Sequence, residues 1–85
     1  MEWVPVESGV IRAVAYEAEA RHLYIEFPSG DVYRYLFIYP GQYREFMAAE
    51  SKGRYFAQHI RDKFPFEKVA REAAGLGGDA VAAGA

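Results

Sequence analysis

Residues 23–38 constrain the fold of this chain more than any other stretch, because they predict two strands around a short turn. Leu23–Phe27 and Val32–Ile38 are rich in β-branched and aromatic residues, which favour strands. Between them, Pro28-Ser29-Gly30 supplies a type I turn closed by a bulge, with glycine where a left-handed residue is needed. These features predict an antiparallel hairpin.

The turn also predicts the register of the hairpin. The opposite pairs are then Phe27 with Asp31, Ile25 with Tyr33 and Leu23 with Tyr35. One face of the hairpin is formed by Leu23, Ile25, Phe27, Tyr33, Tyr35 and Phe37. A four-residue loop would instead bury Arg34 beside Ile25, and an unpaired buried charge is costly. We therefore prefer the bulged register.

The hairpin is expected to belong to a small sheet that helices cover on one face. Residues 10–17 alternate well enough to predict a strand, whereas Pro5 limits the N-terminal segment to an edge or an extended arm. Helical spacing is found in residues 42–50 and 52–63, with Ser51 as a cap. The sequence predicts an α+β fold: a three-stranded antiparallel β-meander with one or two helices packed on one face. The predicted core residues are Leu23, Ile25, Phe27, Tyr33, Tyr35, Tyr43, Phe46, Phe56 and Ile60.

The length of the chain sets the number of domains. At 85 residues with 52% hydrophobic content, it is long enough for one core and too short for two. We expect a single domain over residues 1–66. Residues 67–85 are expected to add a short helix over residues 67–74, supported by an ion pair of Glu67 with Arg71, and a flexible tail rich in Ala and Gly.

Charge is unevenly distributed along the chain. The net charge of −2 gives no general attraction for nucleic acid or for an anionic membrane. Residues 1–31 hold two basic and six acidic side chains, whereas residues 32–66 hold six basic and three acidic ones. A local basic face is therefore compatible with the acidic total.

Cysteine content and hydropathy indicate the cellular compartment in which the protein is expected. The chain has no cysteine, which excludes disulfides and Cys-based zinc sites. The N-terminus lacks a basic start and a continuous apolar stretch, and no run approaches the roughly 20 apolar residues of a membrane-spanning helix. We expect a soluble, cytoplasmic protein that does not associate with a membrane.

The tetrapeptide Ser51-Lys52-Gly53-Arg54 has what a phosphate site needs: a capping residue, a helix N-terminus, a glycine that allows close approach and two cations. Arg61 and Arg34 extend this site if the fold brings them near it. The candidate nucleic-acid-binding residues are Lys52, Gly53, Arg54, Arg61 and Arg34. The alternative is an ordinary helix cap with basic side chains in solvent, which such a tetrapeptide more often is.

Tyr33 and Tyr35 also have two interpretations. Aromatic side chains on a sheet face stack on exposed bases in proteins that bind single strands. The bulged register instead places both rings on the apolar face of the hairpin, so we favour core tyrosines with tethered hydroxyls. Arg34 then points away from that face.

The sequence gives little support for catalysis or for a bound metal. His22 and His59 are 37 residues apart and have no third ligand at a fixed spacing. No nucleophile elbow, oxyanion motif or glycine-rich phosphate loop is present. We therefore expect neither an enzyme, nor a metal site, nor a cofactor.

Several of these segments together resemble the KTSC domain, a short module found alone in bacterial proteins and at the C-terminus of some lysyl-tRNA synthetases. The resemblance covers residues 6–66. It rests on Val6-Glu7-Ser8, Ile11, Tyr16, Leu23, Ile25, Phe27, Gly30, Tyr33-Arg34-Tyr35, Tyr43, Ser51-Lys52-Gly53-Arg54-Tyr55-Phe56, Ile60-Arg61 and Phe64-Pro65. It implies a bacterial protein, and the association of the family with a tRNA synthetase suggests RNA binding.

Two positions depart from the family pattern. The family has Val-Pro after the third strand, where this chain has Ile38-Tyr39 and the proline one place later. The family has Asn where this chain has Ala57. Any contact that this Asn makes in the family is lost here.

Two functions follow from these observations. The first is a binding module for RNA or another polyanion, which acts through the basic start of the second helix. The second is a protein-interaction module, homodimeric or with another protein. Such a module would use a sheet edge or an exposed aromatic patch such as Tyr24, Leu36 and Tyr39.

Overall fold

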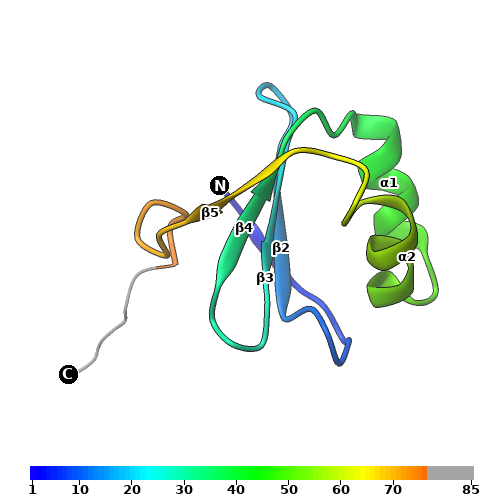
Figure 1. The fold of residues 1–85 in the computed structure, drawn as a ribbon, viewed down its shortest axis with the longest axis horizontal. Coiled ribbons are helices and arrows are strands. Elements are labelled where there is room, and N and C mark those ends of the chain that lie inside the picture. Colours follow the sequence, from blue (N-terminus) through cyan, green and yellow to red (C-terminus); the bar gives the residue numbers. More distant parts are fainter. Residues whose placement is uncertain (77–85) are drawn as a thin grey trace.

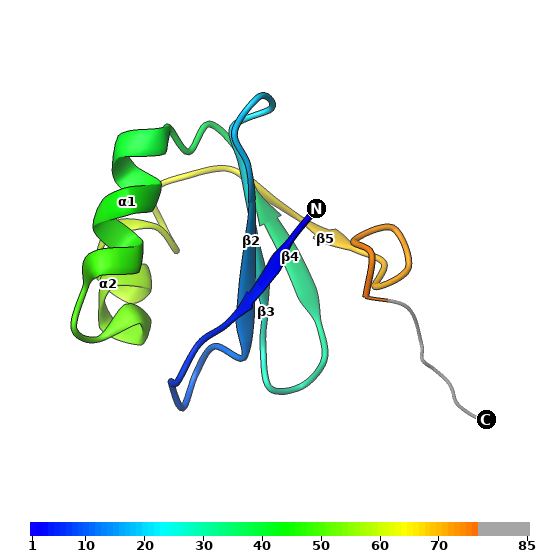
Figure 2. The ribbon, with the colours of Figure 1, turned by 180° about the vertical axis from the view of Figure 1, so that it is seen from behind.

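The computed structural model describes residues 1–76. Its centre is a five-stranded antiparallel sheet in the order β1-β2-β3-β4-β5. Two helices pack against one face of the sheet, which we call the front face; the described residues place no helix on the back face (Figures 1 and 2). The elements are β1 (Trp3–Pro5), β2 (Ala13–Glu17), β3 (His22–Glu26), β4 (Val32–Tyr35), α1 (Pro40–Ala48), α2 (Lys52–His59) and β5 (Phe66–Val69).

The β3–β4 hairpin has the predicted register. Its opposite pairs include Leu23 with Tyr35 and Ile25 with Tyr33. The backbone N–H of Phe27 donates to the Asp31 carbonyl at 2.9 Å, and Gly30 has a φ of 95°. This left-handed conformation strains any residue that carries a Cβ. The bulged turn therefore determines which side chains face the helices.

The main core lies between the front face and the two helices. Its buried members are Ile11, Val14, Leu23, Ile25, Tyr35, Ile38, Phe46, Phe56 and Ile60. Phe27, Tyr33 and Tyr43 are half-buried and pack against it. The rings of Tyr16 and Tyr43 stack with centroids 4.4 Å apart, which fastens α1 to β2. Burial of these apolar side chains is the main free-energy term that favours the fold.

Both helices begin close to their predicted starts and end earlier than predicted. α1 begins at Pro40. Proline suits the first turn of a helix, because backbone N–H groups there have no hydrogen-bond partner within the helix. The predicted cap of α2 is confirmed, because the Ser51 Oγ accepts a hydrogen bond from the backbone N–H of Arg54 at 3.2 Å. Within residues 1–76, neither helix is long or apolar enough to cross a bilayer.

The sheet has two strands more than predicted. β1 pairs with β2 and forms one edge, the kind of position to which Pro5 restricts it. β5 pairs with β4 at the other edge. The prediction of a helix over residues 67–74 is therefore wrong at residues 67–69, which are strand, and residues 71–75 form turns.

Tertiary pairing overrides the local helical signal after residue 66. The Arg34 Nε donates to the Glu67 carboxylate at 2.8 Å, so Glu67 pairs across the sheet instead of along a helix. Phe66 packs against rings of the front face, and Val69 packs against apolar residues on the back face. A strand thus brings one apolar side chain into contact with each face of the sheet, which the short predicted helix cannot do. The fold therefore continues past residue 66; residues 77–85 of the predicted tail lie outside the described residues.

A smaller apolar cluster lies on the back face. It contains Ala15, Tyr24, Val32 and Ala74, with Trp3, Val69 and Leu76 packed against them. The Nε1 of Trp3 donates to the Ala74 carbonyl at 2.8 Å. Residues 70–76, which we call the C-terminal strap, thus close the back face and fasten the two ends of the described chain together.

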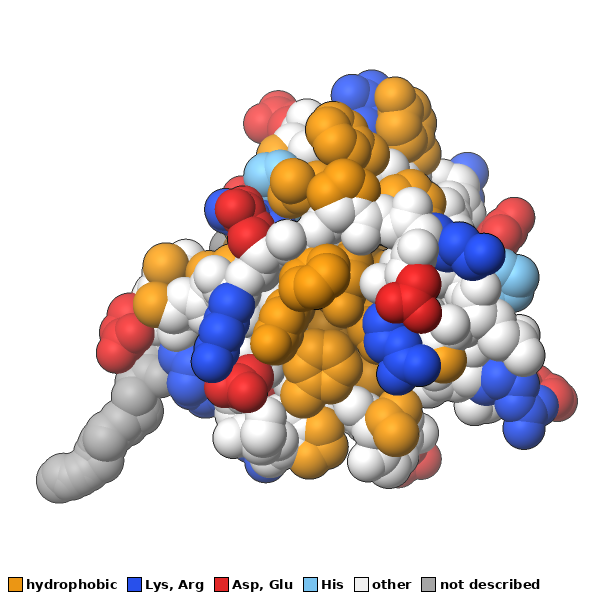
Figure 3. Space-filling model, viewed as in Figure 1, with side chains coloured by type: hydrophobic (Ala, Val, Ile, Leu, Met, Phe, Trp, Pro, Cys, Tyr) orange, Lys and Arg blue, Asp and Glu red, His pale blue; other side chains and the backbone are white. Residues whose placement is uncertain are grey.

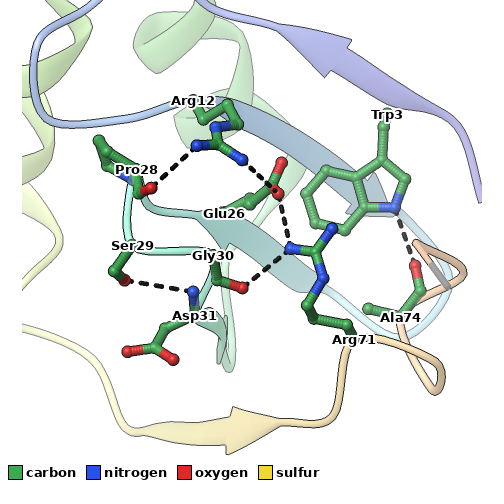
Figure 4. A network of polar contacts seen from close by, with 9 residues as sticks. All are labelled: Trp3, Arg12, Glu26, Pro28, Ser29, Gly30, Asp31, Arg71 and Ala74. Atoms are coloured by element: carbon green, nitrogen blue, oxygen red, sulfur yellow. Dashed lines mark hydrogen bonds and ion pairs between the residues drawn. The ribbon is translucent and has the colours of Figure 1, made fainter. Parts of the chain in front are cut away.

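The Glu26 carboxylate is buried, with the residue only 5% exposed, and is held by two arginines (Figure 4). The Nη1 of Arg71, from the strap, donates to it at 2.7 Å, and the Nη1 of Arg12 lies 3.5 Å away. Arg71 also donates to the Gly30 carbonyl at 2.9 Å. Arg12 donates to the Pro28 carbonyl at 2.9 Å. The two arginines therefore hold the β3–β4 turn to the sheet.

Candidate nucleic-acid interface

Two pockets adjoin each other on the front face. The first, of about 460 Å³, is called here the cationic pocket and is lined by Ser8, Gly9, Val10, Phe27, Ser51, Gly53, Arg54, Phe56, Ala57 and Arg61. The second, of about 390 Å³, is called the aromatic pocket and is lined by Phe27, Ser29, Asp31, Tyr33, Tyr35, Arg61, Asp62 and Phe66. Phe27 and Arg61 line both pockets, so the two are neighbours, and we call them together the groove.

The charged side chains that line the cationic pocket are both arginines. Arg54 lies in the first turn of α2, Arg61 lies two residues after its last residue, and both are exposed. Ser8 and Ser51 add hydroxyl groups to the wall. Because no carboxylate lines this pocket, it is suited to an anionic group.

Gly53 lines this pocket, but the chain itself requires the glycine. A Cβ at position 53 would lie 2.5 Å from Cγ2 of Val10 and 3.1 Å from Oγ of Ser8. Both distances are shorter than ordinary contacts, so a side chain at position 53 would force Val10 and Ser8 to shift. The sequence interpretation assigned this close approach to a phosphate; in the structure, Val10 occupies the space.

The structure brings only part of the predicted basic cluster together. Lys52 lines neither pocket, and its Nζ donates to the Ala49 carbonyl at 3.3 Å. Arg34 lies on the back face, where it pairs with Glu67 and donates from Nη1 to the Tyr24 hydroxyl at 3.3 Å. Hydrogen bonds to Tyr24 and Glu67 raise the pKa of Arg34. The Arg34 guanidinium is therefore held by these two partners. Arg34 therefore does not extend the site of Arg54.

Aromatic rings form the floor and one wall of the aromatic pocket. Tyr33 packs edge-to-face on Phe27, with centroids 5.6 Å apart, and its ring lies 5.5 Å from that of Phe66. Phe66 is 54% exposed. Figure 3 shows a strip of hydrophobic side chains in the middle of this face, with acidic and basic side chains on both sides of it. Such exposed rings offer flat surfaces for stacking.

Tyr35 lies at the base of the aromatic pocket with an uncommitted hydroxyl. The residue is only 3% exposed. Among the described residues, the tyrosine hydroxyls that form hydrogen bonds are those of Tyr16, Tyr24 and Tyr55. Burial raises the pKa of Tyr35 to about 12, and neighbouring Tyr33 also raises it. The hydroxyl is thus protonated at neutral pH and can donate to a ligand.

Two carboxylates line the aromatic pocket beside Arg61. Asp31 lies 3.6 Å from the Nζ of Lys68, which partly neutralises it. Asp62 takes part in none of the ion pairs among the described residues. The aromatic pocket therefore combines carboxylate acceptors with the Arg61 guanidinium and hydroxyl groups, whereas the cationic pocket has arginines and serine hydroxyls but no carboxylate.

The sequence interpretation missed three residues of the groove: Phe66, Asp31 and Asp62. Phe66 carried no strand signal, because the order Phe-Glu-Lys-Val at residues 66–69 does not alternate between apolar and polar side chains. The i,i+4 charge pairs in the same segment favoured a helix instead. Asp62 and Asp31 carry no local signal, because only the fold places them beside the same rings.

The exposed aromatic patch predicted from Tyr24, Leu36 and Tyr39 is not formed. Tyr24 is buried in the back-face cluster, because it alternates with the front-face residues of β3. Tyr39 is exposed beneath the Arg21 guanidinium, 4.5 Å from its ring centroid. Phe37 is 62% exposed and has a φ of 67°. The exposed rings on this side of the molecule are thus Phe37 and Tyr39.

Histidines and carboxylates do not gather into a metal site in the part of the chain that the structure describes. Residues 1–76 contain no group of three or more His, Asp or Glu side chains that could hold an ion. The charged chemistry of the groove therefore comes from its arginines and two aspartates.

Comparisons with known proteins relate the chain to a family. A stretch of 63 residues, 74% of this chain, is 40% identical to a lysine–tRNA ligase of Nostoc punctiforme, of which it covers 11%. An uncharacterized protein of Stutzerimonas stutzeri is 36% identical over 58 residues, with 82% of that protein covered. Among solved structures, a KTSC domain protein from Yersinia pestis superposes with a TM-score of 0.78 at 35% identity. That match covers 81% of this chain and 97% of the other.

The family model of the KTSC domain matches residues 7–64. These residues include β2, β3, β4, α1 and α2. They also include every residue that lines the cationic pocket. β1, β5 and the C-terminal strap lie outside the match. With more than half of its length matched, the chain belongs to the KTSC domain family.

Proposed function

We propose that this protein is a non-catalytic module that binds single-stranded RNA along the groove. The observation that carries the proposal is the junction of the two pockets at Phe27 and Arg61. Arginines that can hold phosphate lie next to rings on which bases can stack, and this combination is typical of proteins that bind single strands.

The relatives support the same class of ligand. The chain spans about a tenth of the length of the lysine–tRNA ligases that it matches. Those enzymes act on a tRNA, as their name says. We infer that the shared segment contributes RNA contacts and that this chain keeps that role. The relatives support RNA binding by analogy alone, whereas the residues that line the groove support it physically.

The proposal assigns a role to each wall of the groove. Arg54 and Arg61 hold phosphates, and their guanidinium groups suit bidentate contact. Tyr33 and Phe66 stack on bases. Lys52 and Arg34, which the sequence interpretation included, are not part of this interface.

The salt dependence of RNA binding tests the proposal. On single strands, each lost phosphate contact makes the negative slope of log K, the association constant, against log salt concentration less steep by about 0.7. Arg61→Gln should therefore reduce the slope by about 0.7 and weaken binding at low salt. Fluorescence anisotropy with a labelled mixed-sequence RNA heptamer measures both quantities. Arg44→Gln, an exposed arginine outside both pockets, removes the same charge and should leave the slope unchanged.

A second variant tests the stacking wall. Phe66→Ala removes the exposed ring and should weaken binding by about 5- to 160-fold, because a base–aromatic stack contributes about 1–3 kcal/mol. Its effect should be the same at all salt concentrations. RNA binding that is absent at low salt, or that responds equally to Arg44→Gln and Arg61→Gln, would contradict the proposal.

A second candidate function is contact with a protein, supported by the exposure of Phe37. A large apolar side chain that is 62% exposed, on a residue with a left-handed backbone, is unusual and is often found at functional positions. The edge of β5 is a poorer contact surface. When two copies of β5 pair in one continuous sheet, the favourable registers place Glu67 opposite Glu67 or Lys68 opposite Lys68, and like charges repel.

A further inference from the structure

The aromatic pocket has a chemical property that general RNA binding does not use. Asp62 lines it without an ion-pair partner among the described residues, and the buried Tyr35 presents a hydroxyl that bonds to none of them. A carboxylate repels phosphate, so this pocket does not suit the backbone of a nucleic acid. It suits a flat, neutral group that donates hydrogen bonds.

The size and the walls of the pocket fit one base of a strand. Its volume of about 390 Å³ lies within the usual range for ligand pockets, about 300 to 1,000 Å³. Phe66 and Tyr33 provide the stacking surface, and Arg61 connects the pocket to the cationic one. A nucleotide whose phosphate contacts Arg61 would thus place its base between the rings and Asp62.

The Watson–Crick edges of the four bases differ in what they offer to a carboxylate. Guanine presents two adjacent donors, N1–H and the N2 amino group, which both oxygens of one carboxylate can accept. Its neighbouring O6 can accept from the Tyr35 hydroxyl or from Arg61. Uracil has a single N–H between two carbonyl oxygens, which face a carboxylate unfavourably. Adenine and cytosine each offer only an amino group on that edge.

We propose that the aromatic pocket selects guanine, with the Asp62 carboxylate accepting from N1–H and N2–H and the Tyr35 hydroxyl donating to O6. This inference rests on the proposed function, because it names the base that the RNA groove prefers. It adds a specificity-determining residue, Asp62, to an interface otherwise made of sequence-independent contacts.

Affinities for four labelled RNA heptamers test the inference. Three carry one guanosine, adenosine or cytidine between uridines, and the fourth is uridine throughout. The heptamer with guanosine should bind about tenfold more tightly than all-uridine RNA, since a bidentate base contact discriminates by about that amount or more. Asp62→Asn should abolish this preference and leave the affinity for all-uridine RNA unchanged or higher, because a repulsive charge is removed.

A matched control removes a carboxylate elsewhere. Glu19→Gln lies in the turn between β2 and β3, is exposed and lines neither pocket, so it should keep the guanosine preference. As a second readout, guanosine 5′-monophosphate should shift the amide NMR signals of Tyr33 and Phe66. Uridine 5′-monophosphate at the same concentration should shift them much less.

The possible results separate the two proposals. If all four heptamers bind with equal affinity, or if the preference survives Asp62→Asn, the guanine assignment is overturned while RNA binding stands. If none binds at low salt, the proposed function is overturned, and the guanine assignment with it. Binding of a proline-rich peptide in place of every RNA would reassign the aromatic pocket to protein recognition.

Discussion

Tyr35 shows at the scale of one residue how a core side chain can also serve a site. Its ring packs edge-to-face on Phe56, with centroids 5.4 Å apart, and so belongs to the core. Tyr35 is also one of the residues that line the aromatic pocket. The prediction of a core tyrosine is confirmed for Tyr35, which is buried, while Tyr33 is half-buried at the pocket wall. Stacking of bases on these rings stays a prediction.

The raised pKa of Tyr35 predicts how stability depends on pH. The unfolded chain releases this proton near pH 10, whereas burial delays its release in the folded chain to about pH 12. The free energy of unfolding should therefore be unaffected below pH 10 and decrease as the pH rises from 10 to 12. The loss amounts to about 3 kcal/mol. Urea unfolding of wild type and Tyr35→Phe across this range measures it.

Tyr35→Phe should show a smaller loss of stability than wild type over the same pH range. Burial also raises the pKa values of Tyr16, Tyr43 and Tyr55, so part of the decrease should remain in the variant. Tyr39→Phe, at an exposed position, should behave like wild type. Equal pH dependence of wild type and Tyr35→Phe would show that burial of this hydroxyl does not perturb its ionisation.

Residues differ in how far their roles can be predicted from sequence. Gly30 was assigned correctly, because the turn that needs it is formed by its immediate neighbours. Gly53 was assigned to a ligand, because the contact that requires it comes from Val10, far away in the sequence. Arg34 was expected to point out of the hairpin, and it does, but its partner Glu67 belongs to a strand that was not predicted.

At the scale of elements, the C-terminal strap is the part of the fold that the local sequence pattern predicts least. Residues 70–76 have no regular helix or strand and are held by long-range contacts, namely Trp3 with Ala74 and Arg71 with Glu26. Such contacts depend on the finished sheet. A pattern search over neighbouring residues therefore cannot find the strap, and it finds a helix instead.

A chain that ends at residue 69 tests what the strap contributes. It loses the Trp3 hydrogen bond and leaves the buried Glu26 carboxylate with Arg12 alone. Removing one partner of a buried ion pair costs about 3–5 kcal/mol, and we expect a decrease in the free energy of unfolding of that order. Urea denaturation provides the measurement. A chain that ends at residue 76 keeps every described contact and serves as the control.

Glu26→Gln in the shortened chain identifies the cause of the loss. The substitution removes the buried charge, so it should restore part of the lost stability if the carboxylate that has lost Arg71 is responsible. In the chain that ends at residue 76, the same substitution should instead destabilise. If the shortened chain has the same free energy of unfolding as the control, the strap covers the sheet without stabilising it.

At the scale of the whole molecule, the two candidate functions use different parts of the surface. The groove lies on the front face over β4, β5 and α2, whereas Phe37 and Tyr39 lie in the connection between β4 and α1 and line neither pocket. The sequence predicted the fold class and the basic start of α2. It did not predict the groove, since this forms only where segments distant in sequence meet.

Phe37→Asn separates the two functions. Asparagine tolerates the left-handed backbone of this position, so the fold should be retained. We expect RNA affinity to be unchanged, because Phe37 is not part of the groove, and we expect any concentration-dependent self-association to disappear. Anisotropy and sedimentation velocity on the same samples give both values. Loss of RNA affinity in this variant would show that the interface extends beyond the groove.

β5 supplies Phe66, yet it lies outside the residues that the family model matches. One of the two rings on which a base would stack, Phe66, therefore lies beyond the matched segment, whereas the other, Tyr33, lies within it. Relatives that keep the arginine-lined half and change only this last strand would inherit a new ligand preference without redesign of their core. Exchange of one short terminal segment between family members would then be the simplest route to altered specificity.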